Sequence, residues 1–168
     1  MEKPVPFVHG AVIPVFGKPR TLHIIPHDAR TTKITLSDDR LEVRTNREDP
    51  SSNIKDFFYA LLRETIDPMW KGHCATLKKS VYQVSIRDTR GRWGSCVPAG
   101  KLMFCWRLVF APMDVVDYVV AHECAHLVQM NHSDKFWKLC DELSIDMAGS
   151  RQWLNDNGDK LMMFGLRR

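Results

Sequence analysis

The sequence feature that most constrains this chain is the pentapeptide His-Glu-Cys-Ala-His at residues 122–126. Residues four apart are neighbours on one face of an α-helix, so His122 and His126 can aim their imidazoles at one metal ion. The surrounding pattern predicts a helix over about residues 112–129. On such a helix Glu123 is turned by about 100° from His122, and it would therefore contact a water beside the ion rather than the ion itself.

A third ligand is needed, because a catalytic zinc usually has three protein ligands and an open position for water. His132 is the best candidate. To bring it back to the ion, the helix must end soon after His126 and the chain must turn sharply. We expect Met130 and Asn131 to form this turn, since Asn tolerates the left-handed conformation, and we expect Ser133 to cap the next helix. The predicted cofactor is one Zn²⁺ per chain, and the alternative is a pair of ordinary surface histidines.

The opposite face of the same helix has the composition of a core contact. It carries Val116, Val120, Cys124 and Leu127. Cys124 would therefore point away from the metal, and we do not count it as a ligand. The chain has five cysteines and no CxxC pair, which argues against a complete disulfide framework and favours reduced thiols in a cytoplasmic protein.

Length and charge set broad limits on the function. A chain of 168 residues suits one domain with a real core. The 24 Lys and Arg against 20 Asp and Glu leave a net charge of +4, which gives only weak support to a nucleic-acid partner. No apolar run approaches the roughly 20 residues of a membrane span, and the start lacks a secretion signal, so we expect no membrane partner. The oligomeric state does not follow from these features.

Residues 1–46 predict a β-rich lead-in. Short apolar or alternating runs are separated by Pro, Gly and Asp, and they predict hairpin strands at Val12–Phe16, Thr21–Ile25, Lys33–Leu36 and Leu41–Val43. Pro14 would place the first strand at a sheet edge. Ser51 or Ser52 could cap the next helix, with Pro68 at or beyond its end.

Residues 80–158 form the predicted metal-binding core. Val81–Ile86 and Leu102–Trp106 predict strands of a small sheet, and glycines mark the turns around Arg92 and Trp93. A last helix should begin near Ser133 and bury Phe136, Leu139, Cys140 and Leu143. The chain is therefore predicted to be an α+β protein with one domain over residues 1–168.

Several segments of this core resemble the YgjP-like metallopeptidase family, which is similar to the WLM and SprT-type zincins. They are Arg-Trp-Gly-Ser-Cys at 92–96, Cys-Trp-Arg-Leu at 105–108, Asp-Tyr-Val-Val-Ala-His-Glu at 117–123, Asn-His-Ser at 131–133 and Phe-Trp at 136–137. The resemblance implies a zincin-like fold, in which a small sheet packs against an active-site helix with three histidine ligands. Cys105 stands where we would expect Asn, and Cys124 replaces the commoner aliphatic residue, but neither departure touches a ligand.

Five further residues are candidates for substrate binding. Zincins often line the cleft with an edge strand that pairs with an extended peptide, and Arg92, Trp93, Gly94 and Ser95 lie in a segment that could supply it. The alternative is that Trp93 is core packing and Arg92 a surface charge. Tyr118 precedes His122 by one helical turn and would either steady a transition-state oxyanion or pack in the core.

The leading functional hypothesis is a zinc metallopeptidase or amidase that acts on a peptide or protein substrate, with Glu123 as the general base. A second hypothesis keeps the metal and replaces the substrate by a nucleotide phosphoanhydride, with Arg87, Arg90 and Arg92 near the phosphates. A third is a DNA- or protein-binding module with a vestigial zinc site. The presence of Glu123 argues against the third hypothesis, because an inactive relic would not need it.

Overall fold

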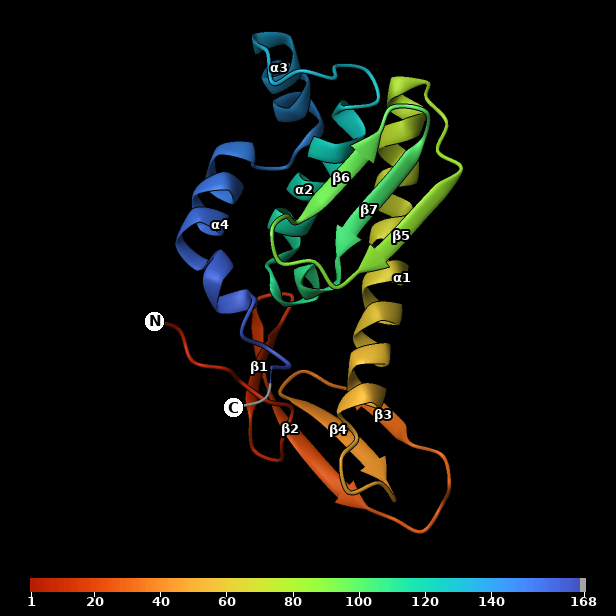
Figure 1. Ribbon diagram of the computed structural model, residues 1–168, viewed down its shortest axis with the longest axis vertical. Helices are drawn as coiled ribbons and strands as arrows, with labels where there is room; N and C mark the ends of the chain where they lie inside the picture. Colours follow the sequence, from red (N-terminus) through yellow and green to blue (C-terminus); the bar gives the residue numbers. More distant parts are fainter. Residues whose placement is uncertain (167–168) are drawn as a thin grey trace.

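The computed structural model describes residues 1–166 and shows a mixed α+β protein, as the sequence predicted. Within this range there are two small sheets and four α-helices (Figure 1). The strands are β1 (Val12–Val15), β2 (Lys18–Pro26), β3 (Lys33–Leu36), β4 (Arg40–Thr45), β5 (Gln83–Arg87), β6 (Gly94–Val97) and β7 (Lys101–Cys105). The helices are α1 (Ser51–Leu77), the short 3-10 helix η1 (Trp106–Phe110), α2 (Met113–Ala125), α3 (Asp134–Leu143) and α4 (Met147–Leu161).

The N-terminal strands form a sheet with the order β1-β2-β4-β3. The expected hairpins are confirmed for β1 with β2 and for β3 with β4, which pair antiparallel. The sequence did not predict how the two hairpins join: β2 and β4 pair in parallel, with Leu22 opposite Leu41. Both leucines are fully buried, because β2 and β4 are the two inner strands of this sheet. Pro14 lies in the edge strand β1, as expected.

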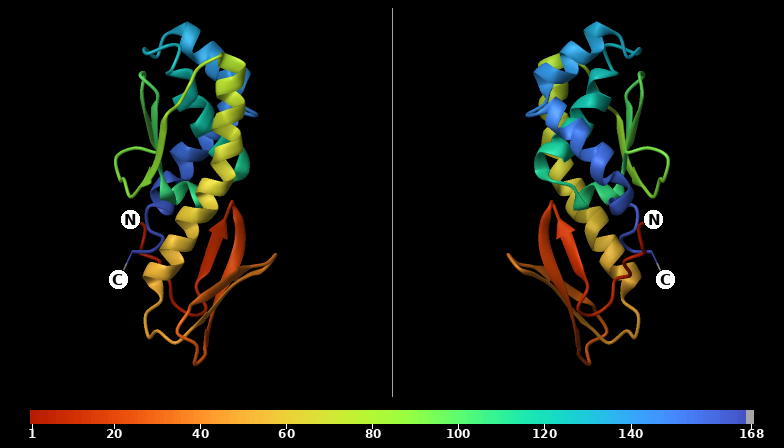
Figure 2. Two further views of the ribbon diagram at one scale, coloured as in Figure 1. Left: turned by 90° about the vertical axis from the view of Figure 1, so that its right-hand side faces the viewer. Right: turned by 90° about the vertical axis from the view of Figure 1, so that its left-hand side faces the viewer.

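Helix α1 connects the two halves of the molecule. Its cap position is Pro50, so Ser51 is already the first helical residue and the expected cap at Ser51 or Ser52 was wrong. The helix continues through Pro68 to Leu77, so the expected end at Pro68 was also wrong. Proline removes one backbone hydrogen bond from a helix. Buried residues on both sides of Pro68, Ile66 before it and Cys74 after it, anchor α1 in the core and offset this loss. The first half of α1 packs beside the N-terminal sheet, and the second half lies behind α2 and the second sheet (Figures 1 and 2).

The second sheet has the order β5-β7-β6 and confirms the small sheet that was predicted next to the pentapeptide helix. Its apolar side chains alternate to one face and pack toward α1 and α2, namely Val84, Ile86, Leu102 and Phe104. The sheet forms an outer layer, and no described helix covers its other face (Figure 2). Strand β6 pairs with β7 on one side only, so its second edge is free.

No helix of residues 1–166 combines the length and the apolarity that crossing a bilayer requires. The longest helix, α1, carries acidic and basic residues along its course. The core contains side chains from all the helices, and α2 lies at its centre. Every residue of α2 from Val115 to Ala121 is buried.

Candidate metal centre

Three histidines converge at the C-terminal end of α2. His122 and His126 lie on the helix, and His132 lies in the loop between α2 and α3. One ligand nitrogen from each ring can be chosen so that all three lie within 4.8 Å of one another. His122 and His126 are partly buried, whereas His132 is exposed. The structure thus brings together the three residues that the sequence predicted as metal ligands, at a place that solvent can reach.

The chain returns to this site by a different turn from the one expected. Helix α2 ends at Ala125 instead of Gln129, and His126 is its C-terminal cap with φ −66° and ψ −15°. The following residues continue as tight turns, with Leu127 N–H donating to Cys124 O and Val128 N–H to Ala125 O. The expectation of a left-handed Asn131 was wrong, since among the described residues only Phe16 and Lys78 are non-glycine residues with positive φ. A series of backbone hydrogen bonds in tight turns, instead of one residue in the left-handed conformation, therefore reverses the chain.

Hydrogen bonds orient the first two imidazoles. Nδ1 of His126 lies 3.1 Å from Gln129 O, so it carries the proton and donates to this carbonyl. Its Nε2 lone pair is then free for a metal, which is how ligating histidines are commonly held. Nδ1 of His122 lies 3.4 Å from the hydroxyl of Tyr118. Tyr118 is buried, so its side chain packs in the core and also touches a candidate ligand.

Burial favours the neutral, metal-binding form of His122 and His126. Burial, with smaller contributions from the neighbouring His126 and His132, lowers the pKa of His122 to about 4. Burial also lowers the pKa of His126. Because a metal ion competes with protons for the same nitrogen, neutral rings at physiological pH favour metal binding. The donor set of three imidazoles suits zinc.

Two aromatic residues of α3 stack on the histidines, a feature that sequence reasoning missed. Phe136 is fully buried and lies parallel to His126, with 4.3 Å between ring centroids. The ring of Trp137 stacks on His132 with an interplanar angle of 22°. The guanidinium carbon of Arg151 lies 4.0 Å from the centroid of the Trp137 ring. Ser133 caps α3 as predicted, and its hydroxyl accepts a hydrogen bond from Phe136 N–H. This predicted cap could have indicated that the first turn of α3 brings both rings next to His132.

Glu123 lies beside the histidines but does not join the group of three. Its side chain is only 7% exposed and lies beneath Gly94 of β6, whose missing Cβ would be 2.8 Å from Glu123 Cγ and 2.9 Å from Oε2. Burial raises the pKa of Glu123 to about 7, and the nearby Arg92 opposes this shift. A carboxyl group that titrates near neutrality is suited to take up and release a proton at physiological pH.

The close approach of Gly94 to Glu123 leads to a prediction. In Gly94→Ala the added methyl group would displace the carboxyl group of Glu123, because Met103 O, 3.1 Å from the same Cβ position, blocks movement of the strand. For a metal-dependent reaction in which this carboxyl group transfers a proton, we expect the rate to fall by roughly 10²-fold, the effect of a small misplacement of a catalytic group. Zinc stoichiometry, measured by atomic absorption, should stay unchanged. Gly91→Ala is the matched control, since a Cβ at Gly91 meets nothing within 4 Å. Full activity in Gly94→Ala would contradict this role of the glycine.

A cavity of about 240 Å³ opens between β6, α2 and α4 at this site. It is lined by Arg92, Trp93, Gly94, Tyr118, Val119, His122, Glu123 and Leu154. Four of the five residues proposed for substrate binding thus surround it. The fifth, Ser95, lines a separate concavity on the outer face of the sheet. Trp93 also packs against α4, where a Cβ on Gly158 would lie 3.4 Å from its ring.

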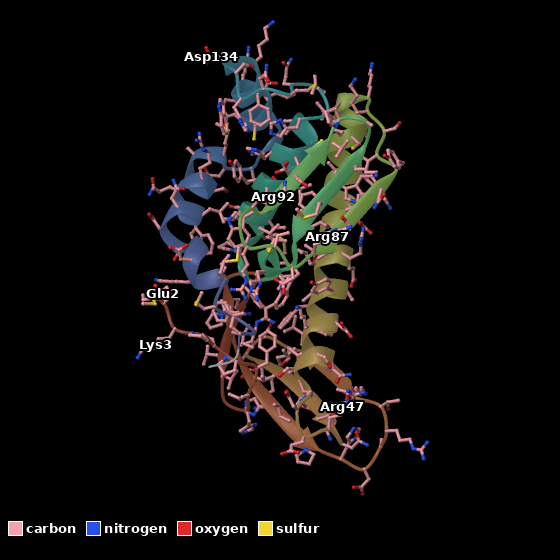
Figure 3. All side chains as sticks on the ribbon, viewed as in Figure 1. Glu2, Lys3, Arg47, Arg87, Arg92 and Asp134 are labelled. Atoms are coloured by element: carbon pink, nitrogen blue, oxygen red, sulfur yellow. The ribbon has the colours of Figure 1, made fainter. Side chains whose placement is uncertain are left out.

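The arginines of the nucleotide hypothesis do not gather in the histidine cavity. Arg92 lines this cavity with Glu123 and His122. Arg87 belongs to the outer face of β5 and lines only the other concavity, which Arg92 borders as well. Figure 3 labels Arg87 at the end of β5 and Arg92 in the loop that leads to β6. Arg90 is an exposed residue of the loop between β5 and β6.

Comparison with known proteins agrees with the site. The family model described as "YgjP-like, metallopeptidase domain" matches residues 1–157, which include the N-terminal sheet as well as the histidines. Searches of curated proteins and of solved structures found no match. The match extends over most of the chain, well beyond the segments in which the resemblance is strongest to the eye. The chain therefore belongs to the YgjP-like metallopeptidase family.

Proposed function

We propose that this protein is a zinc-dependent metallopeptidase of zincin type that hydrolyses peptide bonds in a peptide or protein substrate. The observation that carries the proposal is the position of Glu123, buried beneath Gly94 and next to three convergent histidines. Glu123 forms no direct ion pair within residues 1–166, although Arg92 lies nearby. Burying a carboxyl group without a direct ion pair costs free energy, so a chemical role is the simplest reason for its place.

One zinc ion would be held by His122, His126 and His132. Bound there, it would polarise the scissile carbonyl and lower the pKa of a water molecule toward about 7. Glu123 then supplies the proton transfers. Its carboxylate accepts a proton from the attacking water and passes this proton to the leaving amine. Burial shields this carboxyl group from bulk solvent. Because Glu123 is not one of the three candidate metal ligands, its carboxylate is free to contact the attacking water.

The free edge of β6 provides the place for the substrate backbone. Strand β6 runs beside α2 and ends the sheet, and the cavity of the histidine site opens between this strand and α4. An extended peptide can add to such an edge through main-chain hydrogen bonds, and this mode orients the scissile bond without requiring a particular sequence. The side chain of Tyr118 faces the same cavity and positions His122.

Hydrolysis of a nucleotide phosphoanhydride is less well supported. Only Arg92 of the three proposed phosphate-binding arginines lines the cavity with His122 and Glu123. A vestigial module that binds DNA or protein is also less well supported, because the buried Glu123 and the ordered histidines retain every group that hydrolysis needs. We further propose that residues 1–168 act as one domain, since α1 packs in both halves, and that the five unpaired cysteines reflect a reducing compartment.

The test of this function is a digest of casein and of a mixed peptide library beside a panel of nucleoside triphosphates. Each reaction is run with metal-free protein, with one equivalent of zinc and with excess chelator. Peptide cleavage that requires zinc, with no nucleotide turnover, supports the proposal. Zinc-dependent release of phosphate or pyrophosphate without peptide cleavage would replace it by the nucleotide hypothesis.

The stacking of Trp137 on His132 leads to a second prediction. His132 is the exposed member of the group, so the face of its ring depends on Trp137 for a fixed orientation. We expect Trp137→Ala to weaken zinc binding by roughly 10- to 100-fold, the usual cost of losing a group that orients a ligand. The measurement is a zinc competition titration with a chelating dye. Trp137→Phe, which keeps a stacking ring, should retain most of the affinity. Equal loss in both variants would show that the stack does not orient His132.

A further inference from the structure

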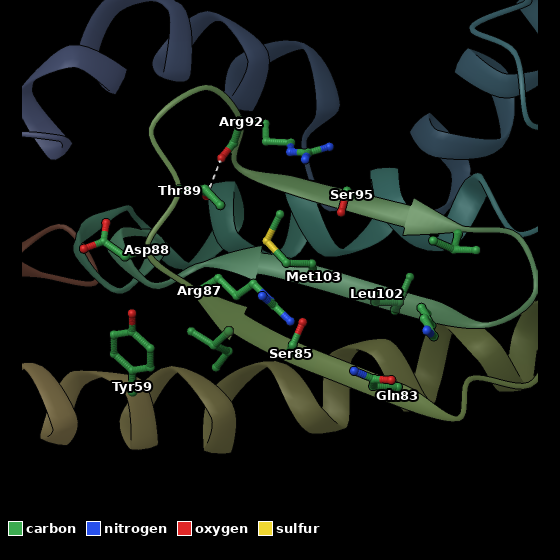
Figure 4. A pocket seen from close by; sticks show the side chains of 13 residues that line it. Tyr59, Gln83, Ser85, Arg87, Asp88, Thr89, Arg92, Ser95, Leu102 and Met103 are labelled. Atoms are coloured by element: carbon green, nitrogen blue, oxygen red, sulfur yellow. Dashed lines mark hydrogen bonds between the residues drawn. The ribbon is translucent and has the colours of Figure 1, made fainter.

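The outer face of the second sheet forms the largest concavity described for this protein, with a volume of about 810 Å³. Its floor consists of the side chains that alternate away from the core on β5, β6 and β7. They include Gln83, Ser85, Arg87, Ser95, Lys101 and Met103. Figure 4 shows Gln83, Ser85, Arg87, Ser95 and Met103 spread over the three strands, with Tyr59 of α1 and Asp88 at one end. The surface is therefore polar and hollow, and no described helix covers it.

The charge of this concavity is positive. Arg87, Arg92 and Lys101 are exposed, and none of them forms an ion pair within residues 1–166. The ammonium group of Lys101 lies 5.9 Å from the centroid of the Tyr82 ring. Cations that are gathered in a hollow without anionic partners attract an anionic ligand, and arginine suits carboxylate or phosphate groups especially well.

The carboxylate that lines the same concavity does not neutralise these cations. Asp88 accepts a hydrogen bond of 2.6 Å from Arg107 and another of 2.8 Å from Lys55. Burial acts to raise the pKa of Asp88, but these two hydrogen bonds prevail and lower it to about 2. Asp88 is thus a permanent anion with two cationic partners of its own, and Arg87, Arg92 and Lys101 remain available.

Arg92 links this surface to the histidine site. It lines the outer concavity and also the smaller cavity of His122 and Glu123. The adjoining strand β6 separates the two: Ser95 points to the outer face, whereas Gly94 lies over Glu123 on the inner face. A substrate on the free edge of β6 would therefore lie next to both surfaces, and its chain beyond the scissile bond can cross the outer face.

We propose that the outer face of β5, β7 and β6 is a docking surface for an acidic segment of the protein substrate, held by Arg87, Arg92 and Lys101. The inference rests on the proposed function for the class of its ligand. A peptide is favoured over a nucleic acid, because this surface adjoins the free edge of β6, where an extended peptide can pair, and because Arg92 also lines the cavity of His122 and Glu123.

The experiment compares two fluorescein-labelled peptides of equal length, one with a run of glutamates and one with glutamines in their place. Binding is followed by fluorescence anisotropy in the Glu123→Gln background, so that the peptides are not consumed. We expect the acidic peptide to bind more tightly, and its advantage to shrink as salt is raised. Arg87→Gln combined with Lys101→Gln should lower the ratio of the two affinities by about tenfold, the effect of losing two solvent-exposed ion pairs.

The matched control is Arg30→Gln combined with Lys33→Gln. It removes the same charge from exposed positions at the far end of the molecule, in the loop before β3 and at its start. This control should keep the acidic preference. Equal binding of the two peptides, or an equal loss in the control, would overturn the proposal, since only general charge attraction would remain. Displacement of the acidic peptide by a tighter-binding oligonucleotide or nucleoside triphosphate would also overturn it.

Hydrolysis by the parent protein separates this inference from the proposed function. Cleavage of acidic peptides in preference to their glutamine counterparts supports both. Cleavage of both peptides at the same kcat/KM counts against the docking surface alone. If zinc-loaded protein cleaves no peptide at all, the proposed function fails, whatever the binding data show.

Discussion

Replacing Glu123 with Gln is expected to lower the hydrolytic rate by roughly 10²–10⁴-fold while the zinc content stays the same. This loss corresponds to about 3 to 5 kcal/mol of transition-state stabilisation. Gln has nearly the same shape as Glu and fits beneath Gly94, but its amide cannot accept a proton from water at neutral pH. Because Glu123 lies outside the histidine group, the variant should still bind metal. The measurements are kcat/KM on a peptide substrate and zinc content after dialysis.

Loss of zinc together with activity in Glu123→Gln would show that the carboxylate is a ligand or supports the ligands. Retained zinc with unchanged activity would place the general base elsewhere. Glu64→Gln is the matched control, because it makes the same chemical change at an exposed residue of α1.

The pH profile gives a second view of the same residue. Burial raises the pKa of Glu123 to about 7. A general base works as the carboxylate, so activity must fall as the pH drops through this pKa. A divalent cation nearby favours the charged form, and the acid limb of the zinc-loaded enzyme should therefore lie below pH 7. In Glu123→Gln the remaining activity should lose this limb.

Replacing His126 with Ala is expected to abolish stoichiometric zinc and all zinc-dependent hydrolysis. The centroid of the His126 ring lies 5.0 Å from that of His122 and 4.8 Å from that of His132. Removing this ring leaves two candidate ligands instead of three. We expect affinity to fall by more than the roughly 10- to 100-fold that losing an orienting group costs. The measurement is zinc content after dialysis, together with a competition titration.

His23→Ala is the matched control for this change. It removes an imidazole from β2, where the ring contacts His9 far from α2. It should bind zinc as the parent does. If His126→Ala retains one equivalent of tightly bound zinc, the three histidines do not form the metal site, and the proposed mechanism fails with it.

The sequence by itself determined the part of this site that depends on local periodicity. The helical spacing of His122 and His126 places their rings on one face, and the single residue step to Glu123 turns it to the side. The Ser133 cap and the apolar pattern behind it predicted where α3 begins. Alternation and turn residues predicted most of the strands. These features depend on neighbours within one or two helical turns, so the sequence contains them directly.

The tertiary structure decided the features that join distant segments. Helix α1 passes through Pro68 because Ile66 and Cys74 are buried on both sides of it, a gain that no local pattern around the proline shows. The parallel pairing of β2 with β4 depends on which strands the core draws together.

The same holds for the surroundings of the metal site. Gly94 lies over Glu123, and Trp137 stacks on His132, only because β6 and α3 pack around the end of α2. Arg87 and Arg92 are close in the sequence, yet the alternation of β5 and the loop after it send Arg87 to the outer face and leave Arg92 at the border of both cavities. Periodicity predicts which face of its own element a residue occupies, but only packing of the elements decides what that face meets.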